Sequence, residues 1–322
     1  MSKSGGSFWA RGPGLLLLLL LVLSGGATAG SIALVYNVAH PPRDRQVLDP
    51  ADVLLQTDDA TFGASDGTPL SGWFVKGRPG WPVILLCHDL GEARSSLLNS
   101  AVALNRAGYP LLVFDFRGHG LSGGKGSTLG ILERLDVLAG IDYLKTRHDV
   151  DAGRFGVWGI GMGAYAASLA AVESKEIVAL ALDSLYPDVA TEVDRRVKAA
   201  MPPALHPLLP LVRLFYGPYF SFKLKTFSVA RLMSDLAGRN LLFIASAEPS
   251  DRHDEVKGLY ASLPQASAGD ANFLELRASV VSGLYAEDKQ KYDEAILKFF
   301  STYLPHAARP AGASKKIQVL EQ

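Results

Sequence analysis

Hydroxyl, imidazole and carboxylate side chains stand close to the ends of several apolar runs in this sequence. A serine can attack a carbonyl group when a histidine takes its proton and an acid orients that histidine. The candidates are the nucleophiles Ser184, Ser246 and Ser250, the bases His88 and His253, and the acids Asp89, Asp251 and Asp254. Hydrolysis by a site rearranged from these residues is therefore one hypothesis.

Metal or thiol chemistry has weaker support. His88, Asp89, Asp251 and His253 are of ligand types that bind divalent metals, but they lack a recognisable metal-site spacing, so we expect no metal and no cofactor. The single cysteine, Cys87, excludes an intramolecular disulfide and a cysteine-based zinc site. It lies within an apolar run and is expected in the core. We interpret Asp251 to Asp254 as a solvated loop before a helix that starts near Glu255.

The elements that position these residues alternate between apolar strands and helices. The expected strands are Val83 to His88, Pro110 to Phe116, Arg154 to Ile160, Ile177 to Asp183, Leu241 to Ala245 and Phe273 to Val281. The expected helices are Ser96 to Arg106, Ile131 to Lys145, Ala164 to Ala171 and Asp288 to Tyr303. This alternation predicts an α/β fold with a mostly parallel sheet and helices on both faces. Ligands bind at the carboxyl ends of such strands.

Four regions define the expected organisation of the chain. Residues 1–40 form an N-terminal membrane anchor or signal segment, and 41–306 form the α/β domain. Within it, 187–234 is rich in Pro, Leu, Phe and Tyr and predicts an inserted helical cap, either packed on the domain or facing a pocket or lipid. Residues 307–322 are expected to be a disordered tail.

The N-terminal segment allows two interpretations. Gly14 to Tyr36 is long enough for one uncleaved helix that spans a bilayer, at about 1.5 Å per residue across about 30 Å. Alternatively, Ala27-Thr28-Ala29 fits the cleavage site of a signal peptide. Both place the domain outside the cytoplasm. The formal net charge is +0, so no basic field indicates nucleic acid as a partner.

A resemblance to a known family comes from several strand ends. Asp115 to Ser122 (DFRGHGLS) resembles the D-x-R-G-H-G-x-S segment of α/β-hydrolases, in which His119 and Ser122 shape a turn. Val157 to Gly163 (VWGIGMG) resembles the G-x-S-x-G nucleophile elbow of the same family, with the methionine after the nucleophile kept as Met162. The resemblance covers about residues 50 to 305. It is closest to membrane-anchored bacterial hydrolases of the serine-aminopeptidase or dienelactone-hydrolase type.

The residues that should carry the chemistry differ from this family's pattern. The nucleophile position is Gly161, and Asp89 replaces the glycine of the loop that helps to build the oxyanion hole. A carboxylate there opposes the stabilisation of a developing oxyanion. The acid position becomes Pro249 and the histidine position becomes Tyr285. A tyrosine, with a pKa of about 10, is a poor general base at neutral pH.

We therefore expect a degenerate α/β-hydrolase, a pseudoenzyme at the membrane with no intact catalytic triad. Such a domain would bind a small molecule or a protein partner. The alternatives are an active esterase- or peptidase-like hydrolase with a rearranged site, and a scaffolding role that uses the cap. The residues expected to line a pocket are His88, Asp89, Gly161, Met162, Asp183, Ser184, Asp251 and Tyr285.

Overall fold

The computed structural model describes residues 12–43, 48–220, 227–248, 250–264, 270–278 and 286–306. The expectations for the 307–322 tail, for Pro249 and for Tyr285 lie outside these residues. The chain divides into two compact units. One contains Met1–Val38 and Glu192–Leu224, and the other contains Ala39–Thr191 and Lys225–Gln322.

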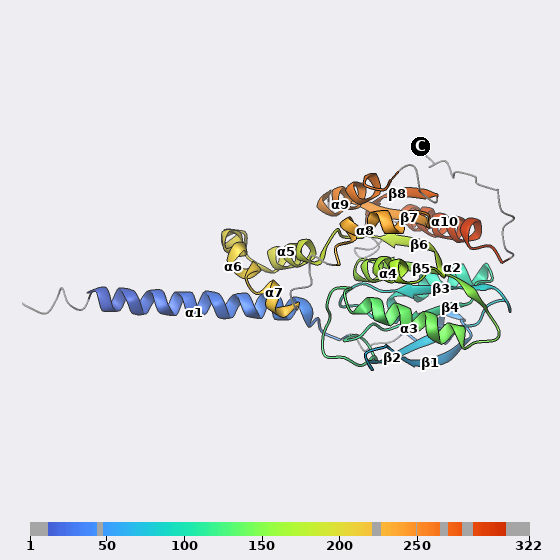
Figure 1. The fold of residues 1–322 in the computed structure, drawn as a ribbon, viewed down its shortest axis with the longest axis horizontal. Helices are drawn as coiled ribbons and strands as arrows, with labels where there is room; N and C mark the ends of the chain where they lie inside the picture. Colours follow the sequence, from blue (N-terminus) through green and yellow to red (C-terminus); the bar gives the residue numbers. More distant parts are fainter. Residues whose placement is uncertain are drawn as a thin grey trace, which may run out of the picture. The chain divides into compact units, whose positions relative to one another are not determined.

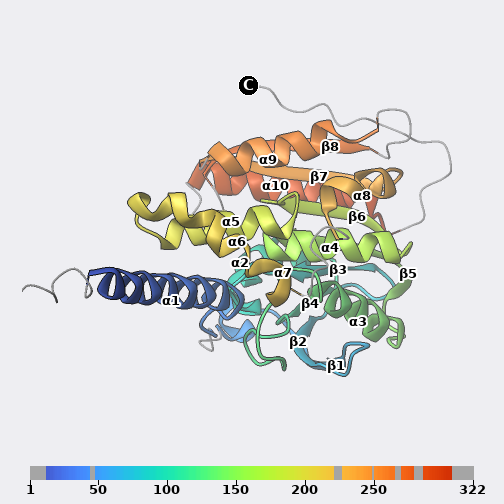
Figure 2. The same ribbon diagram turned by 60° about the vertical axis from the view of Figure 1, so that its left-hand side comes forward.

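The larger unit contains one sheet, in which the described residues form eight strands in the order β1-β2-β4-β3-β5-β6-β7-β8 (Figures 1 and 2). The strands are β1 Thr57–Gly63, β2 Pro69–Val75, β3 Pro82–Cys87, β4 Leu111–Phe114, β5 Asp151–Ile160, β6 Ile177–Asp183, β7 Asn240–Glu248 and β8 Ala271–Ala278. From β4 to β8 all neighbours are parallel, whereas β2 runs antiparallel to both β1 and β4. The expected mostly parallel α/β fold is confirmed.

Alternate residues of the central strands supply two separate packing faces. On one face, Ile84 and Trp158 belong to a large core cluster that also includes side chains of α2 (Leu98–Arg106) and α10 (Ala286–Tyr303). On the other face, Leu85 and Leu112 approach Gly140 of α3 (Glu133–Lys145), which packs on α4 (Met162–Glu173). Burial on both faces explains why β3 and β4 are apolar throughout.

One expectation about local structure is wrong, and one element was not predicted. The hairpin β1–β2 was not expected, because the edge strand β1 carries Asp58 and Asp59 and lacks a continuous apolar run. The helix expected to start near Glu255 is α9, Ser250–Ala261, so Asp254 lies within its first turns. Carboxylates near a helix N-terminus interact favourably with the helix dipole, so this charged run favours helix over loop.

Between β6 and β7 the described chain is helical, as expected for a cap. Its elements are α5 Val189–Ala200, η3 Pro203–Leu208, α6 Leu209–Arg213, α7 Tyr216–Tyr219 and α8 Val229–Leu236. Helix α8 belongs to the larger unit and packs on α4. The smaller unit contains α6, α7 and nearly all of α1, Gly12–Ala39. Among the described residues, Leu20–Ala39 of α1 is apolar and long enough to cross a membrane, which is compatible with an anchor or a signal sequence.

Candidate active site

The turn from β5 into α4 has the backbone of a nucleophile elbow but no side chain at its tip. Gly161 has φ 52° and ψ −110°, a conformation that residues with a Cβ rarely adopt. Its N–H donates to the carbonyl of Asp183 at 2.9 Å, which ties the turn to the end of β6. At Gly163, a Cβ would stand 2.2 Å from the carbonyl oxygen of Cys87, so α4 approaches β3 through glycine.

The Asp89 carboxylate occupies the space at the tip of this elbow. A Cβ built on Gly161 would stand 2.2 Å from Oδ1 of Asp89. The same Oδ1 accepts the backbone N–H of Met162 at 2.7 Å. In an elbow of this kind, the N–H of the residue after the nucleophile is a donor of the oxyanion hole. Asp89 therefore fills the nucleophile's space and already uses that donor.

This placement also gives Asp89 a structural role. Gly161 is the residue before α4 and provides no side-chain cap for the helix. Asp89 supplies the missing acceptor from a loop about 70 residues earlier in the chain, at the positive end of the α4 dipole. The carboxylate thus stabilises the helix start on which the elbow depends.

His88 has both ring nitrogens engaged. Phe116 N–H donates to Nε2 at 3.0 Å, so the proton lies on Nδ1, which donates to the Asp89 carbonyl at 2.7 Å. Burial, with the neighbouring His119, lowers the pKa of His88 from 6.5 to about 4. His88 is therefore a neutral imidazole that holds two loops together, and neither nitrogen is available to take a proton from a nucleophile.

A buried hydrogen-bond chain starts at Asp183, the last residue of β6. Ser184 Oγ donates to Oδ1 at 2.8 Å, and Tyr292 Oη of α10 donates to Oδ2 at 2.9 Å. Trp158 Nε1 donates in turn to Tyr292 Oη at 3.0 Å. Burial raises the pKa of Asp183 to about 6, although these hydrogen bonds oppose the shift. The Ser184 hydroxyl is thus engaged as a hydrogen-bond donor to the Asp183 carboxylate. The Ser184 backbone has φ 53°.

Arg252 is the functional-site residue that sequence reasoning missed. It belongs to α9 and is buried, with its guanidinium carbon 5.3 Å from the Tyr186 ring centroid. Nη1 donates to the Ser184 carbonyl at 3.0 Å. Its charge interacts with both Asp89 and Asp183. A buried cation therefore balances two carboxylates where the sequence suggested a solvated loop.

The structure describes some of the remaining candidate side chains, and others lie outside the described residues. His253 lies 3.2 Å from Glu275 and against Phe273, both of β8, while Asp254 is exposed. Ser246 is buried within β7, and burial raises the pKa of Cys87 in β3. The side chains of Ser250 and Asp251 lie outside the described part of the chain, as do Pro249 and Tyr285. Of the expected pocket residues, the structure brings Asp89, Gly161, Met162, Asp183 and Ser184 together around the elbow.

The segment Asp115 to Ser122 forms a turn, as its resemblance implies. Asp115 Oδ1 accepts Arg94 N–H at 2.8 Å and Oδ2 accepts Leu121 N–H at 3.0 Å. His119 Nε2 accepts Gly91 N–H at 3.1 Å, and Ser122 Oγ donates to the Asp115 carbonyl. His119 thus holds the loop that carries Asp89, and Ser122 closes the turn on Asp115.

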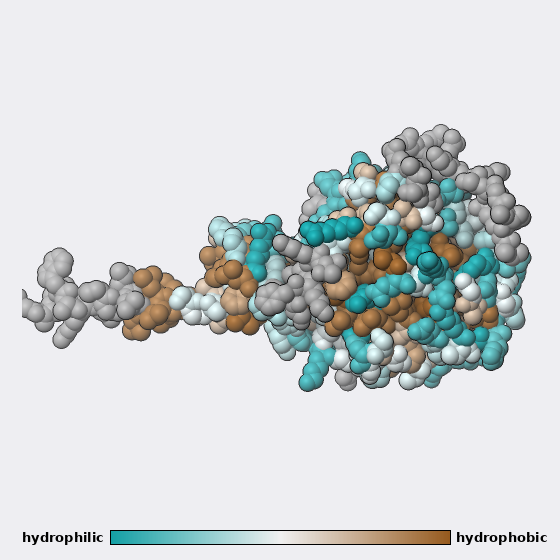
Figure 3. All heavy atoms as spheres, in the orientation of Figure 1, coloured by the Kyte–Doolittle hydropathy of each residue, from teal (hydrophilic) through white to brown (hydrophobic). Residues whose placement is uncertain are grey.

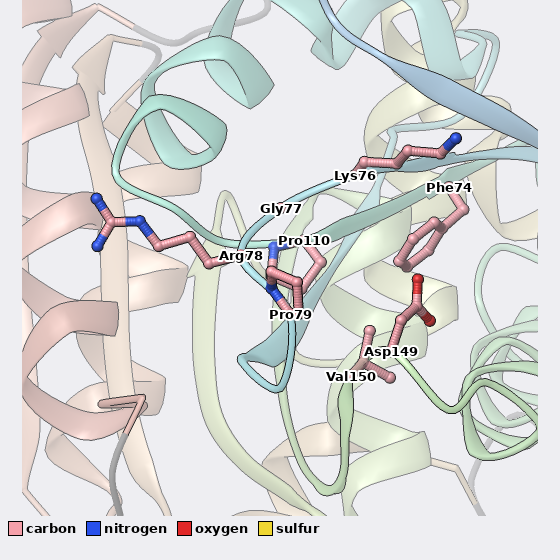
Figure 4. A pocket seen from close by; sticks show the side chains of 8 residues that line it. All are labelled: Phe74, Lys76, Gly77, Arg78, Pro79, Pro110, Asp149 and Val150. Atoms are coloured by element: carbon pink, nitrogen blue, oxygen red, sulfur yellow. The ribbon is translucent and has the colours of Figure 1, made fainter.

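A cavity of about 160 Å³ lies at the amino ends of the parallel strands, away from the elbow at their carboxyl ends. Figure 4 shows its lining residues, Phe74, Lys76, Gly77, Arg78, Pro79, Pro110, Asp149 and Val150. Pro110 and Val150 precede the parallel strands β4 and β5, so this is the amino edge, away from the elbow. Within the described residues no cluster of three His, Cys, Asp or Glu side chains could hold a metal ion.

The shifted pKa values of His88 and Asp183 predict opposite pH dependences of the free energy of unfolding. Folding keeps His88 neutral down to about 4, whereas the unfolded chain binds its proton below 6.5. Unfolding free energy should therefore fall by roughly 3 kcal/mol as pH drops through that window. Folded Asp183 keeps its proton up to about 6, whereas the unfolded residue loses it above 3.8. Its contribution should fall as pH rises, by a similar amount of roughly 3 kcal/mol.

Because the two windows overlap, these two contributions partly cancel in the wild type, and single variants should reveal the separate slopes. Urea unfolding of His88→Gln should show stability falling from acid to neutral pH, and Asp183→Asn should show it rising. NMR titration of His88 in the wild type gives its pKa directly. Variant profiles parallel to the wild type would contradict the assignment.

The elbow, the turn at Asp115 and the sheet order agree with the comparisons to known proteins. Residues 81–239 match the model of the serine aminopeptidase S33 family. Three solved α/β-hydrolase structures of an esterase from Pyrococcus furiosus share the fold; one has a TM-score of 0.68 at 24% identity, covering 83% of this chain and 98% of the esterase. A dienelactone hydrolase from Anabaena variabilis aligns with a TM-score of 0.55 at 15% identity, covering 78% and 99%. Over residues 81–239 the chain is similar to the serine aminopeptidase S33 family, and its fold is that of the α/β-hydrolases.

Curated relatives match over shorter stretches. An uncharacterized protein of Mycobacterium tuberculosis is 33% identical over 176 residues, 54% of this chain and 58% of that protein. The protein YfhR of Salmonella typhimurium is 34% identical over 125 residues, 37% and 41% of the two chains. The α/β hydrolase domain-containing protein WAV2 of Arabidopsis thaliana is 27% identical over 146 residues, 44% and 47%. The chain thus spans about half the length of these relatives.

Proposed function

We propose that this α/β-hydrolase-fold protein is a pseudoenzyme that binds a ligand or partner at a membrane and does not carry out serine hydrolysis. The observation that carries the proposal is the Asp89 carboxylate in the nucleophile's space, bonded to the Met162 N–H. An acyl substrate would need both that space and that donor. A fixed negative charge there also opposes the oxyanion of the transition state.

Ser184 and His88, two of the side chains that could replace the lost serine and histidine, have other partners. Ser184 donates to Asp183, and both nitrogens of His88 are engaged. Loss of the nucleophile or base in a serine enzyme lowers turnover by a factor on the order of 10⁶. These contacts support a binding role over hydrolysis at a rearranged site.

The test is labelling and turnover of the purified full-length chain. A fluorophosphonate probe should label no serine, and nitrophenyl esters should be hydrolysed at the rate of buffer alone. Ser184→Ala should change neither result. Labelling that disappears in Ser184→Ala, with ester turnover lost in parallel, would overturn the proposal in favour of the rearranged hydrolase.

For its location, we propose that α1 is an uncleaved anchor with the α/β domain outside the cytoplasm. The length and apolar character of α1 support this. In the native host, the mature protein should stay in the membrane fraction after carbonate extraction, with its N-terminal residues intact. Cleavage after Ala29 would show a signal peptide instead.

A further inference from the structure

The smaller unit carries an apolar surface that has no role in the α/β fold. From Pro202 to Tyr219 the sequence contains one charged residue, Arg213, and one histidine, His206. Three leucines of this stretch are substantially exposed, Leu205 at 44%, Leu208 at 45% and Leu214 at 67%. Leucines exposed so close together, on a segment almost free of charge, mark an interaction surface.

The cap has a buried apolar interior of its own, and the three exposed leucines are not part of it. Leu209, Val212 and Tyr216 are buried at helical spacing and form the inner side of α6 and α7. Arg213 Nε donates to Asp194 of α5 at 3.0 Å, and Tyr216 Oη donates to the same carboxylate at 2.9 Å. The one charge of the segment is therefore paired, and the exposed leucines stand outside the packed core of the cap.

What covers the exposed leucines follows from helix α1, which belongs to the same unit. Helix α1 exposes large apolar side chains in two groups, Leu18 with Leu20 to Leu23 and Ile32 with Tyr36, separated by small residues (Figure 3). Its 28 residues extend for about 42 Å at about 1.5 Å per residue, more than the roughly 30 Å of a hydrocarbon core. The C-terminal end of α1 therefore reaches the interfacial layer.

Two tyrosines connect the cap to that end of the helix. Tyr36 of α1 and Tyr219 of α7 are both exposed; burial raises the pKa of Tyr219, and Tyr36 lies near enough to add to that rise. Tyrosine is enriched at membrane–water interfaces, where its ring is apolar and its hydroxyl remains wet. The exposed leucines belong to the same compact unit as this level of α1.

We propose that residues 202–219 lie in the interfacial layer of the lipid bilayer that α1 spans, with Leu205, Leu208 and Leu214 inserted among the acyl chains. The proposal rests on the anchor role given to α1 above. A second contact of this kind would hold the cap on the membrane and would make 202–219 a monotopic element next to a spanning helix.

The chain allows a direct test because its one cysteine, Cys87, is buried. Single variants Leu205→Cys, Leu208→Cys and Leu214→Cys of the full chain are labelled with bimane and placed one copy per nanodisc. Phosphatidylcholine with a shallow nitroxide serves as the quencher. Leu20→Cys is the control for the anchor, Leu54→Cys is an exposed leucine of the larger unit, and unlabelled wild type confirms that Cys87 does not react.

Quenching at all three cap positions should exceed that at Leu54→Cys by about twofold or more, because an interfacial helix is buried about 5–10 Å into the headgroup boundary. Cap labels quenched no more than Leu54→Cys, while Leu20→Cys is strongly quenched, would overturn this proposal and leave the anchor intact. An unquenched Leu20→Cys would refute the anchor itself. One copy per disc ensures that a second chain does not cause the quenching.

Discussion

Restoring serine at position 161 is expected to give a less stable protein that still hydrolyses nothing. The new Cβ would meet Asp89 Oδ1, 2.2 Å away in the unchanged structure. Overpacking costs about 1–3 kcal/mol, and a non-glycine residue in a strained backbone region costs about 1–3 kcal/mol more. Urea unfolding of Gly161→Ser should therefore show a loss of about 2–6 kcal/mol, with no labelling by a fluorophosphonate probe.

The matched variants separate the causes. Gly161→Ala should cost nearly as much as Gly161→Ser, because the Cβ and not the hydroxyl makes the contact. In the double variant with Asp89→Gly, the two changes should couple favourably by about 1 kcal/mol or more. A Gly161→Ser protein as stable as the wild type, or additive effects in the double variant, would show that Asp89 does not fill the elbow.

The second large effect is expected from Arg252→Met. Methionine keeps much of the side-chain volume but leaves the carboxylates of Asp89 and Asp183 without their buried cation. Breaking a buried charge pair typically costs about 3–5 kcal/mol, and we expect a loss of that size in urea unfolding. Arg231→Met, on the exposed side of α8, is the control and should change stability by less than about 0.5 kcal/mol.

A second substitution tests whether the lost stability comes from an uncompensated carboxylate. Asp183→Asn in the Arg252→Met background removes one of the two carboxylates, so it should recover part of the lost stability. A measured loss at Arg252→Met equal to that at Arg231→Met would mean that Arg252 is not the counter-charge of the site.

Much of the fold and the site's location could be predicted from local signals. The buried strands are short apolar runs, and residues at their carboxyl ends meet at one edge whatever the loops do. Glycines at 159 and 163 predict the turn before α4, because a Cβ there would stand 2.5 Å from Ala164 N or 2.2 Å from Cys87 O. The resemblance to α/β-hydrolases rested on these turns, and the structural comparisons confirm the fold.

The contacts within the site could not be predicted, because they join distant segments. Asp89 suggested an electrostatic obstacle, but only the approach of β3 to α4 shows that its oxygen stands where a side chain of residue 161 would be. Arg252 sits in a charged run that resembles a solvated loop; its burial depends on α9 starting at Ser250 and packing on β7. Edge strand β1 was missed because one of its faces carries polar residues.

The fit between Asp89 and Gly161 has a consequence for how this sequence can change over generations. A serine at the elbow would require the aspartate to leave, since the two cannot share the space. Replacing Asp89 first removes the acceptor for the Met162 N–H, and replacing Gly161 first creates the clash. Either order passes through a weakened intermediate with no new activity to favour it. If the proposed function holds, the pair therefore opposes a stepwise change to a serine elbow.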